Sequence, residues 1–359
     1  MGRPSGPVPR LGGSTDPVGA VASYGLVMTE TVAAPAHEAA LWSLTNAVVP
    51  ARCLQLIAEI GVADRLHEPA TGADLAERCS VHPAALDRML RLLVSHGVFE
   101  RDGAVYRHND ASALLRSDNP RSMRAFARMM GLPVFAKTWD ALDHSLISGA
   151  PAIEQVAVGG VWPYLQAHPD EARVFHSAME SKAHADIDAV VSAYDFRPFN
   201  AIVDVAGGLG HLLRAVLDTA PSAHGILFEL PDVIGSLPEP RPRETYRGGD
   251  FFTDPLPRAD CYLLMEIIHD WNDAEATEIL RAIRRASSPG ATVLIVESIR
   301  VEDVDDIRAA TLDVIMLAVT GGRERTADEL GHLLRDAGFR PTALLVTAGA
   351  MRVLEALAV

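Results

Sequence analysis

From about residue 200 onwards, short β-rich runs alternate with stretches whose apolar residues recur at helical spacing. The β-rich runs cover residues 201–205, 225–229, 261–265 and 291–297, and helical patterns cover 211–219 and 274–287. Such alternation indicates an α/β fold with a parallel sheet covered by helices. In these sheets ligands bind beyond the carboxyl ends of the strands, so the residues that follow each run are the first candidates for a functional site.

The preceding part of the chain shows a helix, helix, hairpin pattern. One helix is expected to begin near Thr71 and another to cover residues 83–96, after a longer helical stretch at 37–66. A hairpin is expected to turn at Asp102–Gly103. This order of elements is typical of a winged helix, which either binds DNA or serves as a packing or dimerisation module. The formal net charge of −15 disfavours binding to nucleic acid and so favours the second role.

Residues 122–194 are expected to be mostly helical and are rich in aromatic residues and methionine. These side chains either pack in a core or line an apolar pocket, since flat aromatic ligands favour such walls.

A glycine-rich turn follows the first β-rich run, in Asp204-Val-Ala-Gly207-Gly208-Leu-Gly210. Glycine allows a ligand to approach the backbone closely. Leu213 occupies the position of the third glycine of the dinucleotide fingerprint, which disfavours a nicotinamide dehydrogenase. Asp204 lies at the strand end, where its carboxylate can attract a cation.

Two further acidic residues are candidates for binding a nucleoside. Glu229 ends the second run, where an acidic side chain can bind a ribose diol, although a surface glutamate is also expected there. Asp250 and Phe251 combine a carboxylate with an aromatic ring, a pair that suits the amine and the face of an adenine.

His269 lies just beyond the run 261–265 and is placed for proton transfer, because its ordinary pKa lies near neutral pH. A helix cap or a surface histidine is the alternative interpretation. Glu297 and Glu324 fall at other loop positions and are candidates to orient the imidazole.

Several motifs in fixed order resemble the small-molecule O-methyltransferase family of plant caffeic-acid and bacterial polyketide-tailoring enzymes. The resemblance runs from about residue 40 to the carboxyl terminus, in the segments Asp204–Gly210, Phe228-Glu-Leu-Pro-Asp, Gly249-Asp-Phe-Phe, Ile268-His-Asp-Trp-Asn-Asp, Val296-Glu and Gly321-Gly-Arg-Glu-Arg-Thr. It implies a Rossmann-like catalytic domain after a helical, winged-helix dimerisation domain, and it implies a homodimer. The expected boundaries are a disordered tail at 1–35, a dimerisation and substrate-lid region at 36–185 and a catalytic domain at 186–359.

The resemblance also implies roles for individual residues. S-adenosylmethionine would be held by Asp204, Gly207, Gly208, Gly210, Glu229, Asp250 and Phe251, and no metal is expected. His269 would be the general base, flanked by Glu297 and Glu324, and a hydroxylated aromatic acceptor would contact Phe175, Met179, Asp270 and Met316. The chain departs from the family in Ala206 for glycine, Glu229 for the commoner aspartate, and Met265 where many relatives carry a cofactor-contacting lysine.

The predicted function is therefore transfer of a methyl group from S-adenosylmethionine to a hydroxyl of an aromatic or polyketide-like small molecule. Two alternatives stay open: a family member that uses the bound cofactor for hydroxylation, decarboxylation or cyclisation, and a winged-helix regulator that binds DNA. The identity of the acceptor is also open.

Composition suggests the compartment. No apolar run reaches the length of a membrane-spanning helix, so no membrane contact is expected. The three cysteines, Cys53, Cys79 and Cys261, form neither a disulfide framework nor a metal motif, which favours the cytoplasm. A signal peptide within the first residues is the less favoured alternative, and either Met1 or Met28 is a candidate start.

Overall fold

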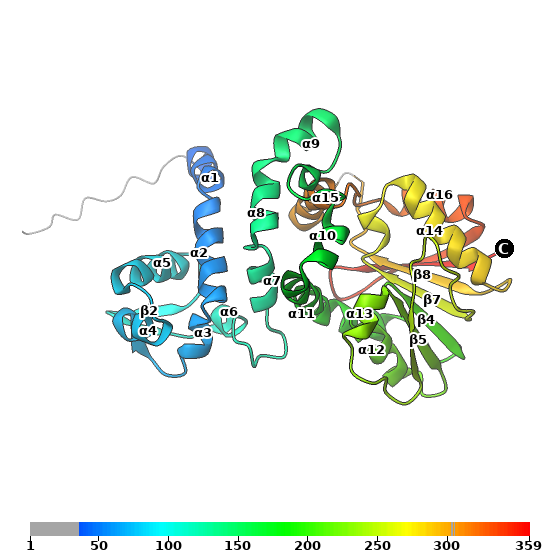
Figure 1. The fold of residues 1–359 in the computed structure, drawn as a ribbon, viewed down its shortest axis with the longest axis horizontal. Coiled ribbons are helices and arrows are strands. Elements are labelled where there is room, and N and C mark those ends of the chain that lie inside the picture. Colours follow the sequence, from blue (N-terminus) through cyan, green and yellow to red (C-terminus); the bar gives the residue numbers. More distant parts are fainter. Residues whose placement is uncertain (1–35, 303, 305) are drawn as a thin grey trace, which may run out of the picture. The chain divides into compact units, whose positions relative to one another are not determined.

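The computed structural model describes residues 36–359, apart from 303 and 305 (Figure 1). The chain divides into two units, residues 1–46 and 47–359. The described part of the first unit contains helix α1 (Ala36–Thr45). The expected tail and the candidate start at Met28 lie outside the described residues.

The second unit begins with the predicted winged-helix pattern. Its elements are α2 (Val48–Glu59), α3 (Val62–Arg65), β1 (Ala70–Thr71), α4 (Gly72–Cys79), α5 (Pro83–Ser95), β2 (Glu100–Asp102) and β3 (Val105–Arg107). The Thr71 hydroxyl accepts a hydrogen bond from Asp74 N and caps α4, as the sequence predicts for this position. Asp102 pairs with Val105, so the hairpin turns where expected, in a three-stranded sheet of order β1-β3-β2.

A helical region follows and agrees with the prediction for residues 122–194. It contains α6 (Asp110–Ala113), α7 (Arg124–Met129), α8 (Pro133–Asp140), α9 (Leu142–Ser148), η1 (Ala152–Gln155), α10 (Val161–Ala167) and α11 (Pro169–Ala193). Helix α11 spans the boundary expected between residues 185 and 186, which stays a prediction. Most of the aromatic and methionine side chains of this region share one apolar core.

The carboxyl-terminal part contains a seven-stranded sheet of order β6-β5-β4-β7-β8-β10-β9. Its strands are β4 (Ala201–Val205), β5 (His224–Glu229), β6 (Glu244–Gly248), β7 (Cys261–Met265), β8 (Thr292–Glu297), β9 (Phe339–Val346) and β10 (Arg352–Ala358). The five strands from β6 to β8 are parallel, whereas β10 runs antiparallel to both β8 and β9. The four predicted β-rich runs correspond to β4, β5, β7 and β8, and the Rossmann-like prediction is confirmed.

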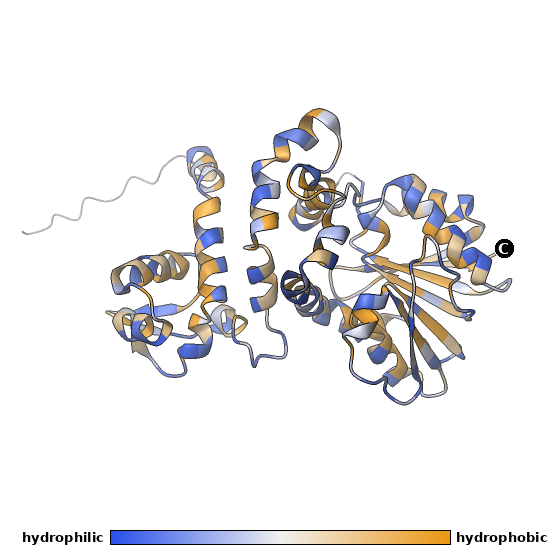
Figure 2. Cartoon of the chain, in the orientation of Figure 1, coloured by the Kyte–Doolittle hydropathy of each residue, from blue (hydrophilic) through white to orange (hydrophobic). Residues whose placement is uncertain are grey.

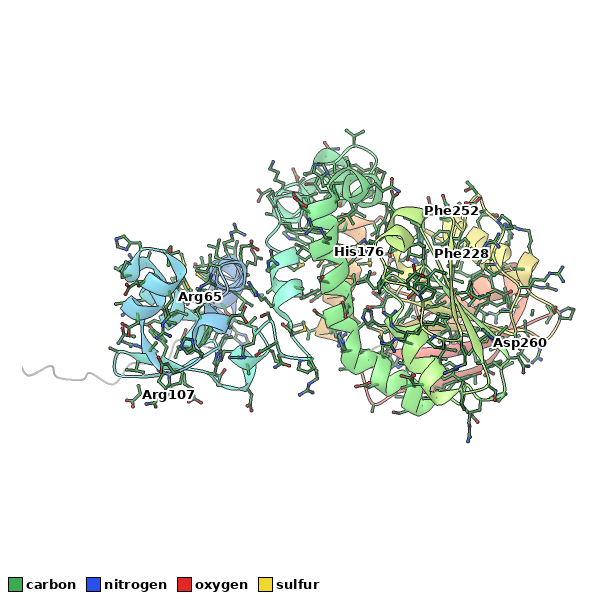
Figure 3. All side chains as sticks on the ribbon, turned by 60° about the horizontal axis from the view of Figure 1, so that its bottom comes forward. Arg65, Arg107, His176, Phe228, Phe252 and Asp260 are labelled. Carbon is green, nitrogen blue, oxygen red and sulfur yellow. The ribbon has the colours of Figure 1, made fainter. Side chains whose placement is uncertain are left out.

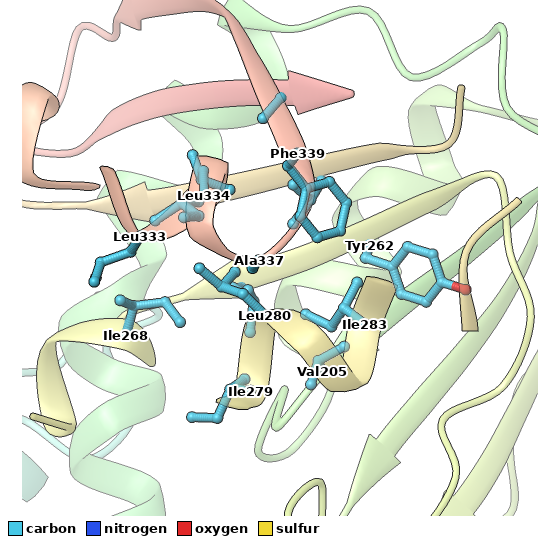
Figure 4. Close-up of a cluster of buried hydrophobic side chains, with 14 of the residues drawn as sticks. Val205, Tyr262, Ile268, Ile279, Leu280, Ile283, Leu333, Leu334, Ala337 and Phe339 are labelled. Atoms are coloured by element: carbon cyan, nitrogen blue, oxygen red, sulfur yellow. The ribbon is translucent and has the colours of Figure 1, made fainter. Parts of the chain in front are cut away.

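Helices cover both faces of this sheet (Figure 1). The remaining elements are α12 (His211–Thr219), α13 (Pro231–Gly235), η2 (Ile268–Asp270), α14 (Asp273–Ala286), α15 (Ile307–Val319) and α16 (Ala327–Asp336). Helices α14 and α16 pack on one face through a core that includes Tyr262, Ile279 and Leu334 (Figure 4). Residues of α11 and α12 pack on the other face.

The strands at the centre of the sheet are mostly apolar, whereas the covering helices are amphipathic (Figure 2). This is the pattern expected when a parallel sheet is buried on both faces. Cys261, at the start of β7, is fully buried, as predicted for a small core residue. Within the described residues, no helix combines the length and the apolar character needed to cross a membrane.

The order of the strands fixes where a ligand can bind. From β4 the chain continues outwards to β5 and β6, and it then returns to place β7 and β8 on the other side of β4. The reversal between β4 and β7 is a topological switch point, which opens a crevice at the carboxyl ends of these two strands. Asp204 and Val205 lie at one side of this crevice, and the segment that leads to His269 begins at the other.

Candidate active site

The glycine turn and His269 lie at the same edge of the sheet. Strand β4 ends at Val205, and β7, its parallel neighbour, ends at Met265. In Figure 3, Phe228 near the end of β5 and Phe252 lie on the side of the sheet that is closer to His176 of α11. Asp260, just before β7, lies at the opposite edge of the sheet. The topology therefore brings the predicted cofactor segment and the predicted base together.

His269 is buried between two carboxylates. Its Nδ1 lies 2.8 Å from Glu324 Oε1, and its backbone N–H donates to Glu297 Oε1 at 3.0 Å. Because an ionised carboxylate can only accept, Nδ1 carries the proton in this pair. Nε2 lies 3.8 Å from Asp270 Oδ1, beyond hydrogen-bond distance, and is the nitrogen left to exchange a proton with a ligand.

Glu324 reaches the imidazole because its backbone packs directly on the segment of His269. A Cβ at Gly322 would lie 1.9 Å from the carbonyl oxygen of His269, so only glycine fits there. Arg323 N then donates to that same oxygen at 2.9 Å. Glu324 N donates to Asp313 Oδ1 of α15 at 2.8 Å, which fixes the position of its side chain.

Arg325 holds the other side of the His269 segment, and the sequence analysis did not identify it. Its guanidinium is fully buried and donates to the carbonyl oxygens of Ile268 at 2.9 Å and Trp271 at 2.7 Å. It also donates to Asp273 Oδ1 at 2.9 Å. A charged residue in a glycine-rich loop normally suggests exposure, so only the contacts reveal this role.

Replacement of Arg325 by methionine is expected to lower the free energy of unfolding by about 2–5 kcal/mol, because two buried carbonyl groups lose their donor. Thermal or urea unfolding followed by circular dichroism measures the change. The matched control is Arg323→Met, which removes an exposed ion pair with Glu329 and is expected to cost about 1 kcal/mol or less. Equal losses in the two variants would contradict this account of Arg325.

The charges around His269 set its protonation. Burial disfavours the imidazolium, but the hydrogen bond to Glu324 and the charges of Asp270, Glu297 and Glu324 outweigh it and raise the pKa of His269 to about 10. Burial raises the pKa of Glu297 to about 7 and that of Asp270 to about 6. The ligand-free centre therefore holds an imidazolium paired with Glu324 at neutral pH.

Two carboxylate oxygens of this centre have no hydrogen-bond partner among the residues that the structure describes. They are Oε2 of Glu297 and Oε2 of Glu324, and both are buried. A buried acceptor without a partner is costly, so these atoms point to a polar or cationic group supplied from outside the chain.

The glycine turn packs on a buried carboxylate. Asp204 is almost fully buried, burial raises its pKa to about 7, and its Oδ2 has no partner in the described part of the chain. A Cβ at Gly207 would lie 2.3 Å from Asp204 Oδ2, so glycine is required for this approach. Glu229 is also buried: Oε2 accepts from Gly208 N at 2.9 Å and Oε1 from Leu230 N at 2.7 Å. It is thus joined to the glycine turn rather than exposed at a strand tip.

An aromatic row connects the predicted adenine segment with the predicted acceptor segment. Phe251 packs edge-to-face on Trp271, with the ring centroids 5.7 Å apart. Trp271 stacks on Trp162 of α10 at 6.4 Å, and Trp162 packs edge-to-face on Phe175 of α11 at 6.0 Å. The Asp250 carboxylate makes a local hydrogen bond, in which its Oδ1 accepts from Phe252 N at 2.8 Å.

The other acceptor candidates come from two helices. Phe175 and Met179 lie one turn apart on α11 and are partly buried, and Met316 of α15 is buried. An apolar hollow of about 500 Å³ lies beside α15, lined by Met130, Trp139, Ile307, Ala310, Thr311, Val314 and Ile315. Neither His269 nor the candidate residues of α11 belong to its lining, so this hollow is separate from the proton-transfer centre.

Two ion pairs join α11 to the carboxyl edge of the sheet, and neither was predicted from the sequence. Lys182 Nζ donates to Glu266 Oε1 at 2.5 Å, just after β7, and both side chains are largely buried. His211 Nε2 lies 2.6 Å from Glu180 Oε1, directly after the glycine turn. Because these pairs form between distant segments, no local sequence pattern signals them.

Comparisons with known proteins identify both parts of the chain. The family model of the O-methyltransferase domain matches residues 139–340, and that of the O-methyltransferase dimerisation domain matches residues 42–118. Phenazine O-methyltransferase PhzM of Lysobacter antibioticus is 36% identical over 311 residues, which cover 84% of this chain and 91% of the relative.

Solved structures agree with this assignment. Human N-acetylserotonin methyltransferase in complex with S-adenosylmethionine gives a TM-score of 0.85 at 25% identity, covering 92% of this chain and 99% of the human one. The O-methyltransferase NcsB1 from neocarzinostatin biosynthesis, in complex with S-adenosylmethionine and 2-hydroxy-5-methyl naphthoic acid, gives 0.71 at 29% identity, covering 87% and 96%. The fold, the carboxyl-edge site and these similarities lead to one conclusion: the chain belongs to the S-adenosylmethionine-dependent O-methyltransferases.

Proposed function

We propose that this enzyme transfers the methyl group of S-adenosylmethionine to a hydroxyl of an aromatic or polyketide-like acceptor, with His269 as the general base. The observation that carries the proposal is the buried imidazole whose Nδ1 is held by Glu324 at 2.8 Å, so that Nε2 is left for the acceptor. The intact trio of His269, Glu297 and Glu324 favours methyl transfer over the non-methylating chemistry considered above.

The residues of the glycine turn fit the cofactor. The close approach of Gly207 to Asp204 leaves backbone rather than side chain along the turn, and the Oδ2 atom of Asp204 offers a free acceptor behind it. Asp204, Gly207, Gly208 and Gly210 would line the cofactor, Glu229 would accept from the ribose, and Asp250 with Phe251 would hold the adenine. When bound, the cofactor supplies a methyl group already activated on a cationic sulfur.

The chain's own residues would orient the acceptor and move its proton. Neutral His269 would take the hydroxyl proton at Nε2, while Glu324 holds Nδ1–H and stabilises the imidazolium that forms. Glu297 would keep the segment in place through its bond to the His269 backbone. Glu297 and Asp270 add negative charge that favours a protonated imidazole.

An aromatic acceptor suits the aromatic row that passes through Trp271, two residues after His269. The row from Phe251 through Trp271 and Trp162 to Phe175 offers ring faces and edges, and Met179 and Met316 add adaptable apolar surface. NcsB1, which was solved with a naphthoic acid, supports this class of acceptor by similarity. We also propose a homodimer, on the strength of the match to the dimerisation domain.

The test is a transfer assay with S-adenosylmethionine labelled in its methyl group and a panel of phenols, naphthols and hydroxyquinones. We expect labelled methyl ether and S-adenosylhomocysteine in equal amounts, no reaction with acceptors whose hydroxyls are already methylated, and unchanged rates in the presence of a chelator. Turnover of the cofactor without methyl ether, or none with any hydroxylated aromatic, would overturn the proposal.

A further inference from the structure

We propose that Glu180, His184 and His211 form a binding site for the α-amino-acid end of the cofactor, with Glu180 taking the ammonium group and the two histidines the carboxylate. The proposal rests on the proposed cofactor but is independent of the acceptor and of His269. Glu229, Asp250 and Phe251 account for the nucleoside, and the glycine turn offers the amino-acid end backbone rather than charged side chains.

The position of the cluster supports this assignment. His211 is the first residue of α12 and directly follows Gly210, the last glycine of the turn. Glu180 and His184 are four residues apart, so they lie on the same side of α11. Lys182 lies between Glu180 and His184 on α11 and donates a hydrogen bond to Glu266, the residue after β7. This contact places α11 over the carboxyl edge of the sheet, next to the crevice.

The chemistry of the cluster matches a zwitterion. An α-amino acid carries one cation and one anion on the same carbon, and the cluster presents a carboxylate beside imidazoles. The Glu180 carboxylate lies 2.6 Å from His211 Nε2, and the rings of His184 and His211 lie 6.0 Å apart. The hydrogen bond from His211 lowers the pKa of Glu180, so this side chain is ionised at neutral pH. The ammonium group of a bound amino acid can take the place of His211 beside Glu180, which frees the imidazole for the carboxylate.

Two further observations point to a ligand rather than to a purely structural ion pair. His184 Nδ1 is buried and has no hydrogen-bond partner among the described residues. The first turn of α12 contains no acidic side chain, so the positive end of its dipole adds to the attraction for a carboxylate. A metal ion does not explain the cluster, since the described residues contain no group of three or more ligands able to hold one.

The structural alternative predicts a small effect. The side chains of His211 and Glu180 are 29% and 32% exposed, and a partly exposed pair of this kind contributes little to stability. If the pair only fastened α11 to α12, its loss would change the binding of every part of the cofactor by the same factor.

Titration calorimetry with two ligands separates these possibilities. S-adenosylhomocysteine carries the amino-acid group, and 5′-methylthioadenosine has the same adenosyl thioether without it. For Glu180→Gln and His211→Asn we expect affinity for S-adenosylhomocysteine to fall about tenfold or more, the loss of one charge-assisted hydrogen bond. The affinity for 5′-methylthioadenosine should stay within about twofold of the affinity of the wild-type protein. His184→Asn should behave in the same way.

The controls lie on the same helix and on another strand. Asp188→Asn, exposed on α11, and His224→Asn, exposed at the start of β5, should leave both affinities unchanged. Parallel losses for both ligands, or no loss for either, would overturn the inference while leaving the proposed function intact. Absence of binding of both ligands to the unchanged protein would overturn the proposed cofactor together with this site.

Discussion

His269→Ala is expected to lower kcat by roughly 10²–10⁴-fold, the range for loss of a positioned general base. The side chain is buried, is held at Nδ1 by Glu324 and presents Nε2 as its free nitrogen, so alanine removes the group positioned to take the proton. Steady-state methyl transfer to a phenolic acceptor at neutral pH measures the change.

The loss should be confined to the chemical step. Binding of S-adenosylhomocysteine to His269→Ala should stay within a few-fold of the unchanged protein, because the imidazole has no part in the cofactor site proposed above. His332→Ala, an exposed histidine of α16, is the matched control and should retain full activity. A variant that keeps its turnover would reject His269 as the base.

Glu324→Gln is expected to shift the pH dependence of the reaction to lower pH and to lower its plateau by about 10²-fold or more. The base must be neutral, and the pKa of His269 is about 10 in the ligand-free protein. The rate in the unchanged enzyme therefore rises with pH towards that value. Glutamine can still accept from Nδ1–H but carries no charge, so the imidazolium loses the negative charge beside it, the pKa of His269 falls and the rise of the rate with pH comes earlier.

The profile of kcat/KM measures this shift, and an imidazole ¹⁵N titration by nuclear magnetic resonance assigns it to His269. The hydroxyl of the free acceptor ionises in the same way in both assays, so any difference between the two pH profiles comes from a group of the enzyme. Glu278→Gln, an exposed residue of α14, is the control and should follow the unchanged profile. An identical profile for Glu324→Gln would contradict the pairing with His269.

Four of the five parallel strands could be predicted because each is a local apolar pattern, whereas β6 (Glu244–Gly248), which is mostly exposed, was not predicted. Apolar runs such as 201–205 are buried, and turns and amphipathic helices such as α12 and α14 separate them from the next strand. Strands β9 and β10 were not predicted. Strand β10 pairs antiparallel with both β8 and β9, and β9, at the edge of the sheet, is largely exposed, so its pattern is less apolar than that of a buried parallel strand.

The candidate residues at strand ends could be named from the sequence, whereas their partners could not. His269, Glu297 and Glu324 come from three segments that are far apart in the sequence, and the topology alone brings the first two to the same edge. The contact with Glu324 depends on the absence of a side chain at Gly322, and the support from Arg325 depends on carbonyl groups, which leave no trace in a sequence. Glu229 was expected to be exposed at the end of a strand, but it is buried, and its carboxylate accepts a hydrogen bond from Gly208 N.

The backbone docking at Gly322 has a consequence for how acceptor preference can change. The imidazole and its carboxylate partner are aligned by contacts between segments 268–271 and 322–325 and by Asp313 of α15, and not by the proposed acceptor residues Phe175, Met179 and Met316. Substitutions at those three residues can therefore reshape the space for a new phenol while the proton-transfer pair keeps its geometry. Libraries built on Phe175, Met179 and Met316 should accordingly yield variants with new acceptors more often than libraries built on the two docked segments.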